Sequence, residues 1–492
     1  MTTATKYEVI IGIEVHAQLA TKSKMFCSCA TDYHNGASNT YVCPVCLGMP
    51  GMLPVINQRA VEFTIMTGLA LNCTIPERAK FDRKNYPYPD LPKGYQISQY
   101  DLPLCKGGWL DIQVEGETKR IGITRVHLEE DTARSMHRSN GVEDYSLVDF
   151  NRSGTPLMEI VTEPDVRSGK EARAYVTKLQ QILRYVGASR ANLEEGNMRC
   201  EPNISLRPVG RQEYGTKVEL KNLNSFRAVE LGIDFEIARQ SKLLDAGERV
   251  MQETRGWRDD SSETVSQRSK EAAEDYRYFP EPDLPPVGIT PAYVAELRAS
   301  LPELPDAKRQ RLMAEYGLGE YEANLLSSTA ARADYYERAA ARTGGDDERI
   351  RARGKAVANW MLGDLARLTN IDGIEPHESK VQPEVLRELV ELIEEETVSV
   401  TGAKSVFEEM YKSGKDPRAI VQEQGLTQIS SSDELSGLVT RVIESNPKPV
   451  ADYRGGKESA LKALVGLLMR ETRGRANPQL AEELLRKQLD GG

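Results

Sequence analysis

Apolar and polar residues alternate near the start of the chain. Over residues 9–19 every second position is apolar, and the positions between them include Glu14, His16 and Gln18. This period of two predicts a β-strand whose polar side chains all project from one face. Residues 122–131, 146–151 and 157–162 are also predicted to form strands.

Two segments among these strands have the 3.6-residue period of amphipathic helices. The first opens with Ser168-Gly-Lys-Glu171, the pattern of a capping box, and stops at Gly187. The second runs from about Ser225 to Ala246. Strands and helices interleave without a regular βαβ repeat, which favours an α+β or irregular α/β fold for this part of the chain.

The pattern changes after the proline-rich stretch at residues 279–286. From about residue 291 the chain is rich in Ala, Leu, Glu and Arg with helical periodicity, and a break at Thr401-Gly402 precedes a last helical stretch. We therefore predict an α+β cradle domain over 1–290, an all-α helical domain over 291–400 and a small helical tail domain over 401–492. The length of 492 residues agrees with about three domains of roughly 150 residues each.

Four of the seven cysteines lie close together in the sequence. Cys27 and Cys29 form a C-x-C pair, and after a polar, turn-rich gap Cys43 and Cys46 form a C-x-x-C pair. Four thiolates from two short knuckles can close a tetrahedral, structural zinc site. The alternatives are unrelated free thiols or a redox C-x-x-C, although the glycines and proline after Cys46 disfavour the helix that a redox motif would open.

Carboxylates gather on three of the predicted strands. Glu14 shares a strand face with His16, and a second strand ends in the consecutive acids Glu129, Glu130 and Asp131. Glu159 lies inside an apolar run, where a charge needs a proton, a metal ion or a basic partner such as the nearby Arg152. Carboxylates with one imidazole suit Mg²⁺ that bridges nucleotide phosphates. Nothing in the sequence alone brings the three strands together.

The composition is that of a globular protein, and its charge is unevenly placed. Sixty-four basic and 74 acidic residues give a net charge of −10, which disfavours nucleic acid unless basic residues gather locally. Such a gathering lies in the tail, at Arg454, Lys457, Lys462, Arg470, Arg473 and Arg475. This stretch could follow a phosphate backbone, although from charge alone a solvated helix face is favoured.

Several sequence motifs are missing. No apolar run approaches the roughly 20 residues that span a bilayer, and the first residues lack the features of a signal peptide, which predicts a cytoplasmic protein. Neither G-x-x-x-x-G-K-[ST] nor G-x-G-x-x-G occurs, so any nucleotide must be held by another kind of site. The sequence shows no amidase or glutaminase motif, so we expect no ammonia production by this chain alone.

Motifs along essentially the whole chain resemble one family, the GatB subunit of the tRNA-dependent amidotransferase GatCAB, the aspartyl/glutamyl-tRNA(Asn/Gln) amidotransferase. The motifs that carry the resemblance span residues 12–16, 80–90, 95–101, 122–131, 147–160, 195–200, 219–226, 275–282 and 474–478. The longest is Leu147-Val-Asp-Phe-Asn-Arg-Ser-Gly-Thr-Pro-Leu-Met-Glu-Ile160, and the last lies in a tail similar to the YqeY-like domain of the family.

The resemblance implies an ATP-dependent, two-step reaction on Glu-tRNA(Gln), Asp-tRNA(Asn) or both. The side-chain carboxylate is phosphorylated by ATP, and ammonia from a partner amidase subunit then displaces the phosphate. The implied assembly is a heterotrimer with the amidase subunit (GatA) and a small subunit (GatC), with glutamine as the amide donor. The tail would bind tRNA.

The resemblance also implies roles for individual residues. His16, Glu130 and Glu159 fall where the magnesium ligands of the family lie, with Glu14 and Glu129 as neighbours. Arg83 and Lys84 are candidates for contacts with ATP phosphates or the tRNA acceptor end; the alternative is a surface charge at a strand edge. Only some members of the family have the cysteine knuckle, so zinc would have a stabilising role.

Two other functions compete with this one. The first is a zinc-stabilised tRNA-binding scaffold whose partner performs all the chemistry. The second is a free-standing, ammonia-dependent ligase for a small carboxylate, which would turn over ATP without tRNA.

Overall fold

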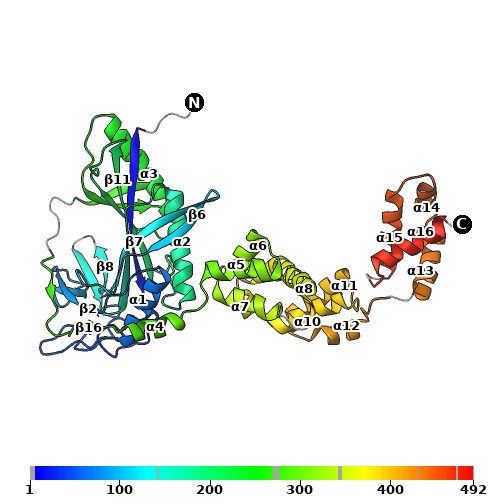
Figure 1. Cartoon of the computed structure of the whole chain (residues 1–492), viewed down its shortest axis with the longest axis horizontal. Helices are drawn as coiled ribbons and strands as arrows, with labels where there is room; N and C mark the ends of the chain where they lie inside the picture. The colour runs from blue at the N-terminus through cyan, green and yellow to red at the C-terminus, as the bar shows by residue number, and fades with distance from the viewer. Residues whose placement is uncertain are drawn as a thin grey trace. The chain divides into compact units, whose positions relative to one another are not determined.

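The structure is a computed structural model that describes residues 6–139, 141, 143–269, 276–341, 346–429, 432–472 and 475–490. The chain divides into two compact units, Met1–Leu304 and Pro305–Gly492 (Figure 1). The first unit combines a large sheet with helices, and the described elements of the second are all helical. The predicted α+β domain followed by helical domains is thereby confirmed.

A nine-stranded sheet forms the centre of the first unit. Its strand order is β14-β13-β12-β11-β1-β10-β7-β5, with β6 also paired to β7, and only β12 and β13 pair in parallel. The central strands are β11 Met198–Pro208, β1 Tyr7–Gln18, β10 Pro156–Thr162 and β7 Glu117–Glu130. The outer strands are β14 Glu263–Ser269, β13 Glu253–Arg258, β12 Val218–Lys221, β5 Cys105–Lys106 and β6 Trp109–Val114.

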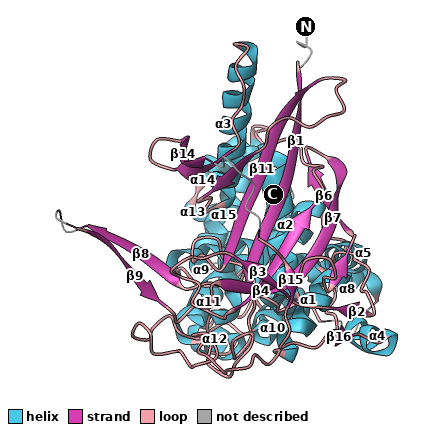
Figure 2. Cartoon of the chain, turned by 90° about the vertical axis from the view of Figure 1, so that its left-hand side faces the viewer, coloured by secondary structure: helices cyan, strands magenta, loops and turns pink. Residues whose placement is uncertain are grey.

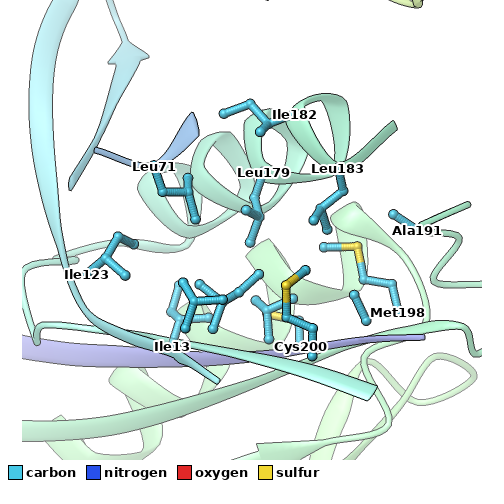
Figure 3. Close-up of a cluster of buried hydrophobic side chains, with 14 of the residues drawn as sticks. Ile13, Leu71, Ile123, Leu179, Ile182, Leu183, Ala191, Met198 and Cys200 are labelled. Atoms are coloured by element: carbon cyan, nitrogen blue, oxygen red, sulfur yellow. The ribbon is translucent and has the colours of Figure 1, made fainter. Parts of the chain in front are cut away.

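One face of this sheet is apolar and covered by helices. The odd-numbered residues of β1 carry the apolar side chains, and Ile11, Ile13 and Val15 are at most 1% exposed. They share a core with helices α1 Gln58–Ala70, α2 Gly169–Tyr185 and α3 Phe226–Asp245. Figure 3 shows Leu179 and Leu183 of α2 on the side of the sheet that carries Ile13 and Cys200. The even-numbered face of β1 is therefore left for polar residues.

The start of α2 differs in one detail from the predicted capping box. Ser168 caps the helix, because its hydroxyl accepts a hydrogen bond from the backbone N–H of Glu171 at 3.2 Å. The Glu171 carboxylate accepts from the backbone N–H of Arg167 and not from that of Ser168. The reciprocal bond of the box thus moves one residue towards the N-terminus.

Smaller elements surround the main sheet. A three-stranded sheet has the order β15-β3-β4, a pair joins β16 to β2, and β8 and β9 form a separate antiparallel hairpin. These strands are β2 Arg78–Ala79, β3 Asp82–Asn85, β4 Tyr95–Ser98, β8 Arg134–Ser139, β9 Asp144–Asp149, β15 Phe279–Pro280 and β16 Val287–Gly288. The hairpin projects away from the body of the first unit (Figure 2). Helix α4, Pro291–Ala299, packs against α1 and completes this unit.

The second unit contains two apolar cores. The first core is formed by α5 Pro305–Tyr316, α6 Glu320–Leu326, α7 Ala330–Ala339, α8 Asp347–Trp360, the π-helical turn Met361–Leu365, α9 Ala366–Asp372, α10 Pro383–Glu394, α11 Val400–Ser413 and α12 Pro417–Gln424. A 3₁₀ turn, Pro376–Glu378, lies between α9 and α10 in the sequence. The second core, which starts at Ile429, is formed by α13 Ser432–Ser445, α14 Pro447–Arg454, α15 Ser459–Glu471 and α16 Pro478–Asp490.

The apolar cores indicate where the domain boundaries lie. Leu297 of α4 belongs to the core of the first unit, which extends to Leu304. Phe407 of α11 belongs to the core of the helical domain, because it packs against Trp360 with ring centroids 5.2 Å apart. The domain boundaries expected near residues 290 and 401 stay a prediction. The membership of the apolar cores favours boundaries near residues 304 and 428 instead.

Candidate active site and metal centres

Three neighbouring strands place His16, Glu159 and His127 in one row. His16 of β1 is the register partner of Glu159 on β10, and Glu159 is in turn the partner of His127 on β7. The Oε2 atom of Glu159 lies 3.2 Å from His16 Nε2 and 3.3 Å from His127 Nε2. Glu159 is only 6% exposed, as its apolar neighbours in the sequence predict. The sheet thus supplies the contact that the sequence alone could not.

Glu129 completes this cluster from the end of β7. It follows His127 by two residues, so both side chains project from the same face of the strand. Its Oε1 atom lies 3.6 Å from His16 Nε2, and its Oε2 accepts a hydrogen bond from Ser98 Oγ at 3.1 Å. Ligand atoms of His16, Glu129 and Glu159 all lie within 4.8 Å of one another, close enough to hold one metal ion.

The structure does not bring Glu130 to this cluster, in contrast to the expectation that it would be a ligand beside His16 and Glu159. Successive residues of a strand point to opposite faces, so Glu129 and Glu130 diverge. Glu130 pairs with Lys93, and its Oε1 accepts the backbone N–H of Ile97 at 3.1 Å. It lines a cavity shared with the cysteine knuckles. The acid that joins His16 and Glu159 is Glu129.

The charges of the cluster are mutually supporting. Burial acts to lower the pKa of His16, but the adjoining carboxylates of Glu159 and Glu129 outweigh it and raise that pKa to about 9. Burial acts to raise the pKa of Glu159, but His127 and His16 bring it well below its usual range. Without a metal ion, protonated His16 therefore supplies positive charge to the buried carboxylates. His127 accepts a hydrogen bond from Arg125 Nε at its Nδ1, at 3.3 Å, which leaves its Nε2–H to face Glu159.

Arg152 is not the partner of Glu159, and that hypothesis was wrong. Its guanidinium donates to the backbone carbonyls of Thr132 and Ala133, both at 2.8 Å, and lies 3.7 Å from the carboxylate of Asp131. The basic residue near Glu159 is Arg125, with Nη2 3.7 Å from Oε1.

Glu14 lies next to the cluster on the polar face of β1. Burial, together with the charge of Glu159, raises its pKa, and its Oε1 accepts a hydrogen bond from Asn203 Nδ2 at 3.1 Å. Its register partner on β11 is Glu201, which pairs with Lys221 at 3.1 Å. The polar face of the sheet is therefore acidic beyond the three clustered residues.

The neighbours Arg83 and Lys84 on β3 have different environments. Arg83 forms two hydrogen bonds with the buried carboxylate of Glu281, at 2.6 and 2.8 Å, which gives it a structural partner. Lys84 points to the other side of the strand. Burial acts to lower its pKa, but Glu129 and other nearby groups raise it above its usual range. Lys84 is thus the cation of this pair that lies by the acidic cluster.

The four cysteines come together as a second possible metal centre. The Sγ atoms of Cys27, Cys29, Cys43 and Cys46 lie within 4.8 Å of one another. A tetrahedral zinc with Zn–S bonds of about 2.3 Å needs sulfurs about 3.8 Å apart, so small adjustments would complete the site. Two donors favour a thiolate at Cys46. The N–H of Cys43 lies 3.2 Å from Cys46 Sγ, and the buried ammonium of Lys24 lies 3.6 Å from the same sulfur.

The basic residues of the tail lie mostly on its surface. Arg454, Lys457 and Arg470 are exposed, although Lys457 lies 3.9 Å from Asp452. Arg475 is half-buried and donates to the carbonyl of Thr472 at 3.3 Å. Arg473 lies outside the described residues.

Sequence reasoning missed two residues of these centres. His127 was recognised only as part of a motif, although its spacing of two residues from Glu129 on a strand places both on one face. Lys24 gave no signal, because a lysine in a loop ordinarily predicts surface exposure. The structure buries it completely and satisfies its ammonium with the carbonyls of Tyr41 and Phe150 as well as the sulfur.

Comparison with known proteins adds independent information. Residues 9–295 match the family described as the GatB/GatE catalytic domain, and residues 347–489 match the one described as the GatB domain. Among the described residues, no helix has the length and apolar composition needed to cross a membrane.

Curated relatives match over nearly their full length. The aspartyl/glutamyl-tRNA(Asn/Gln) amidotransferase B subunit of Carboxydothermus hydrogenoformans is 53% identical over 485 residues, which cover 98% of this chain and 99% of that protein. The protein of the same name from Dehalococcoides mccartyi strain CBDB1 is 53% identical over 492 residues, covering 99% and 100%. The one from Caldanaerobacter subterraneus is 51% identical over 484 residues, covering 98% and 99%. The chain therefore belongs to the family of aspartyl/glutamyl-tRNA(Asn/Gln) amidotransferase B subunits.

Proposed function

We propose that this chain catalyses ATP-dependent transamidation of Glu-tRNA(Gln), Asp-tRNA(Asn) or both. ATP would phosphorylate the side-chain carboxylate of the misacylated residue, with release of ADP. Ammonia would then attack the acyl phosphate and release inorganic phosphate, which leaves the amide. The observation that carries the proposal is the convergence of His16, Glu129 and Glu159 from three strands of one sheet.

The clustered residues fit a magnesium ion. They offer carboxylate oxygens and the imidazole Nε2 of His16, which faces both carboxylates. When bound there, Mg²⁺ supplies positive charge that offsets the repulsion between the substrate carboxylate and the γ-phosphate of ATP. His16, Glu129 and Glu159 would hold the ion.

The surrounding residues orient these side chains. Ser98 donates to Glu129, and His127 holds the same Glu159 oxygen that faces His16. Fixed partners of this kind keep ligand side chains in one geometry. Lys84, whose ammonium lies 4.8 Å from the ring centre of Tyr276, would neutralise a phosphate that approaches the cluster. Arg83 would act structurally, through Glu281.

The proposal needs partners. Ammonia would come from glutamine through an amidase subunit (GatA), in a cytoplasmic heterotrimer that also contains a small subunit (GatC). The relatives carry the name of the B subunit of an amidotransferase, which supports such an assembly. The tail helices would bind tRNA, and zinc at the four cysteines would stabilise the fold.

A scaffold without chemistry of its own fits the site less well. Four titratable side chains, His127, Glu129 and Glu159 buried and His16 half-buried, lie within 4 Å of a neighbour in the cluster. Their burial costs folding free energy, and such clusters are frequent at active sites. The single change Glu159→Gln separates the two functions. Transamidation predicts that amidation with ammonium chloride as donor falls at least about 100-fold in the assembled complex.

The controls for this experiment are a matched variant and a binding assay. Glu163→Gln changes an exposed carboxylate four residues beyond Glu159, which accepts a hydrogen bond from the hydroxyl of Thr124 at 2.7 Å, and should leave the rate unchanged. The dissociation constant for tRNA should be the same for all three proteins. Amidation that survives Glu159→Gln would favour the scaffold, and ATP turnover with free glutamate alone would favour the small-carboxylate ligase.

A further inference from the structure

The β8–β9 hairpin is inserted between the two strands that supply Glu129 and Glu159. Strand β7 ends at Glu130, the hairpin occupies residues 134–149, and β10 begins at Pro156. Arg134 follows Glu129 by five positions, so the base of the hairpin lies within about 17 Å of the cluster along the chain. Six-residue strands extend it by about 20 Å. Whatever the hairpin binds is therefore held near the candidate active site.

The two faces of the hairpin differ in character. The register pairs Met136 with Leu147 and Arg138 with Tyr145, and Arg134 with Asp149, which places these six residues on one face. Tyr145 and Leu147 are 47% and 48% exposed. The other face carries Ser135, His137, Ser139, Asp144, Ser146 and Val148. The first face is thus an exposed surface of arginines and apolar side chains.

Within the described part of the chain, neither Arg134 nor Arg138 forms a salt bridge, although the charge of Arg134 acts on Asp149 opposite it. Asp149, the acid opposite Arg134, is already bonded at the base, where its Oδ1 accepts the backbone N–H of Asn39 at 3.1 Å and that of Asn151 at 3.0 Å. The guanidinium groups of Arg134 and Arg138 are therefore available to an external anion.

The loop between the two cysteine pairs fixes the base of the hairpin. Asn39 forms three hydrogen bonds with the end of β9 and the residue after it. Its backbone N–H donates to Asp149, its side-chain amide donates to the carbonyl of Val148 at 3.2 Å, and its side-chain oxygen accepts the N–H of Phe150 at 2.7 Å. The backbone N–H of Tyr41 donates to Asn151 at 2.8 Å. Asn39 has a φ of +60°, a conformation in which asparagine is favoured over most residues. These bonds hold the hairpin in one orientation.

We propose that this face of the hairpin binds the RNA substrate next to its reacting end, a role that rests on the proposed function. Arg134 and Arg138 contact backbone phosphates, and Tyr145 stacks on an unpaired base. Recognition of RNA commonly combines arginines with aromatic side chains that stack on splayed bases. Protein interfaces are also enriched in arginine, tyrosine and methionine, so composition does not separate the two kinds of partner. The position of the hairpin between the strands that supply Glu129 and Glu159 favours the RNA substrate, whose reacting end must reach this cluster.

The first test compares two arginine variants with the parent, each as the full chain in the assembled complex, with a tRNA(Gln) transcript as the probe. Arg134→Ala with Arg138→Ala should weaken binding and lower the slope of log K against log salt by about two, one for each lost phosphate contact. A charge-matched variant exchanges residues 134 with 135 and 138 with 139, so that both arginines move to the other face. It should bind as weakly as the double alanine variant if the face is what matters.

Two substitutions at position 145 examine stacking separately. Tyr145→Ala should weaken binding about tenfold, whereas Tyr145→Phe, which keeps the ring, should bind like the parent protein. Melting temperatures should stay unchanged, because Tyr145 and both arginines lie outside the apolar cores.

The outcomes separate the two proposals. If the parent protein binds no tRNA, both the proposed function and this inference fail. If the parent binds and the arginine and tyrosine variants bind equally well, only the inference is overturned. A photoreactive side chain at position 147 should crosslink to the RNA, and a crosslink to another subunit instead would assign this face to a protein partner and overturn it as well.

Discussion

Glu159 stands directly opposite His16 in the antiparallel ladder between β10 and β1, and their side chains meet at 3.2 Å. This one pairing joins a buried carboxylate from the middle of the first unit to an imidazole near the start of the chain. It places the candidate active site on the polar face of the sheet, because the apolar core covers the other face of β1.

Substitution of the two adjacent glutamates should have opposite consequences. Glu129→Gln should lower the affinity for Mn²⁺, used as a probe for Mg²⁺, at least about tenfold, because it removes a ligand from the cluster. Glu130→Gln should keep that affinity but lower the free energy of unfolding by about 3 kcal/mol, because the partly buried Lys93 loses its charged partner. Titration calorimetry and urea unfolding measure the two effects. The reverse pattern would return Glu130 to the metal site.

Arg83 and Lys84 form a second informative pair. Arg83→Met leaves Glu281 buried without its charged partner, so we expect a loss of stability of about 3 kcal/mol. Lys84→Met should lower kcat of ammonia-dependent amidation while leaving the melting temperature close to that of the parent. Thermal melts and steady-state kinetics on both variants decide the question. A Lys84→Met protein with unchanged kcat would remove Lys84 from the proposed chemistry.

The four cysteines should bind zinc. Purified protein should contain about one zinc per chain by elemental analysis, and Cys43→Ser with Cys46→Ser should lose it together with thermal stability. Cys73→Ala is the control, since Cys73 is buried away from the cluster and its loss should leave the zinc content unchanged. Parent protein free of zinc after purification in the presence of zinc salt would disprove the assignment.

The tail should contribute to tRNA binding and not to chemistry. Removal of residues 429–492 should weaken tRNA affinity and spare ammonia-dependent amidation at saturating tRNA, because it takes away the last helical core as a unit. Removal from residue 401 should instead unfold the helical domain, since Phe407 and its neighbours belong to that core. Filter binding and circular dichroism distinguish the two truncations. Unchanged tRNA affinity at physiological salt would make the basic stretch a solvated surface.

Local patterns predicted those parts of the site that depend on a single element. The alternation over residues 9–19 placed Glu14, His16 and Gln18 on one face, and the apolar run around Glu159 predicted its burial. The spacing of the cysteines predicted their approach. Each of these features follows from a strand period or a short loop, which neighbouring residues determine.

Features that depend on how strands pair could not be predicted. The register that aligns His16, Glu159 and His127 results from packing of three strands far apart in the sequence. Whether Glu129 or Glu130 faces His16 depends on the register of β7 against β10. A shift of one residue in this register would turn the other glutamate towards the cluster. The burial of Lys24 depends on carbonyls from two distant loops. Sequence patterns carry little information on such long-range contacts.

The cluster of His16, Glu129 and Glu159 should serve phosphorylation of the tRNA-bound carboxylate by ATP. The most direct test measures ADP release by the assembled complex in the absence of glutamine and ammonia. We expect the parent protein to release ADP only when misacylated tRNA is present, and Glu159→Gln to abolish this release while tRNA binding is retained. ADP release by Glu159→Gln at the parent rate would show that the cluster does not serve this step.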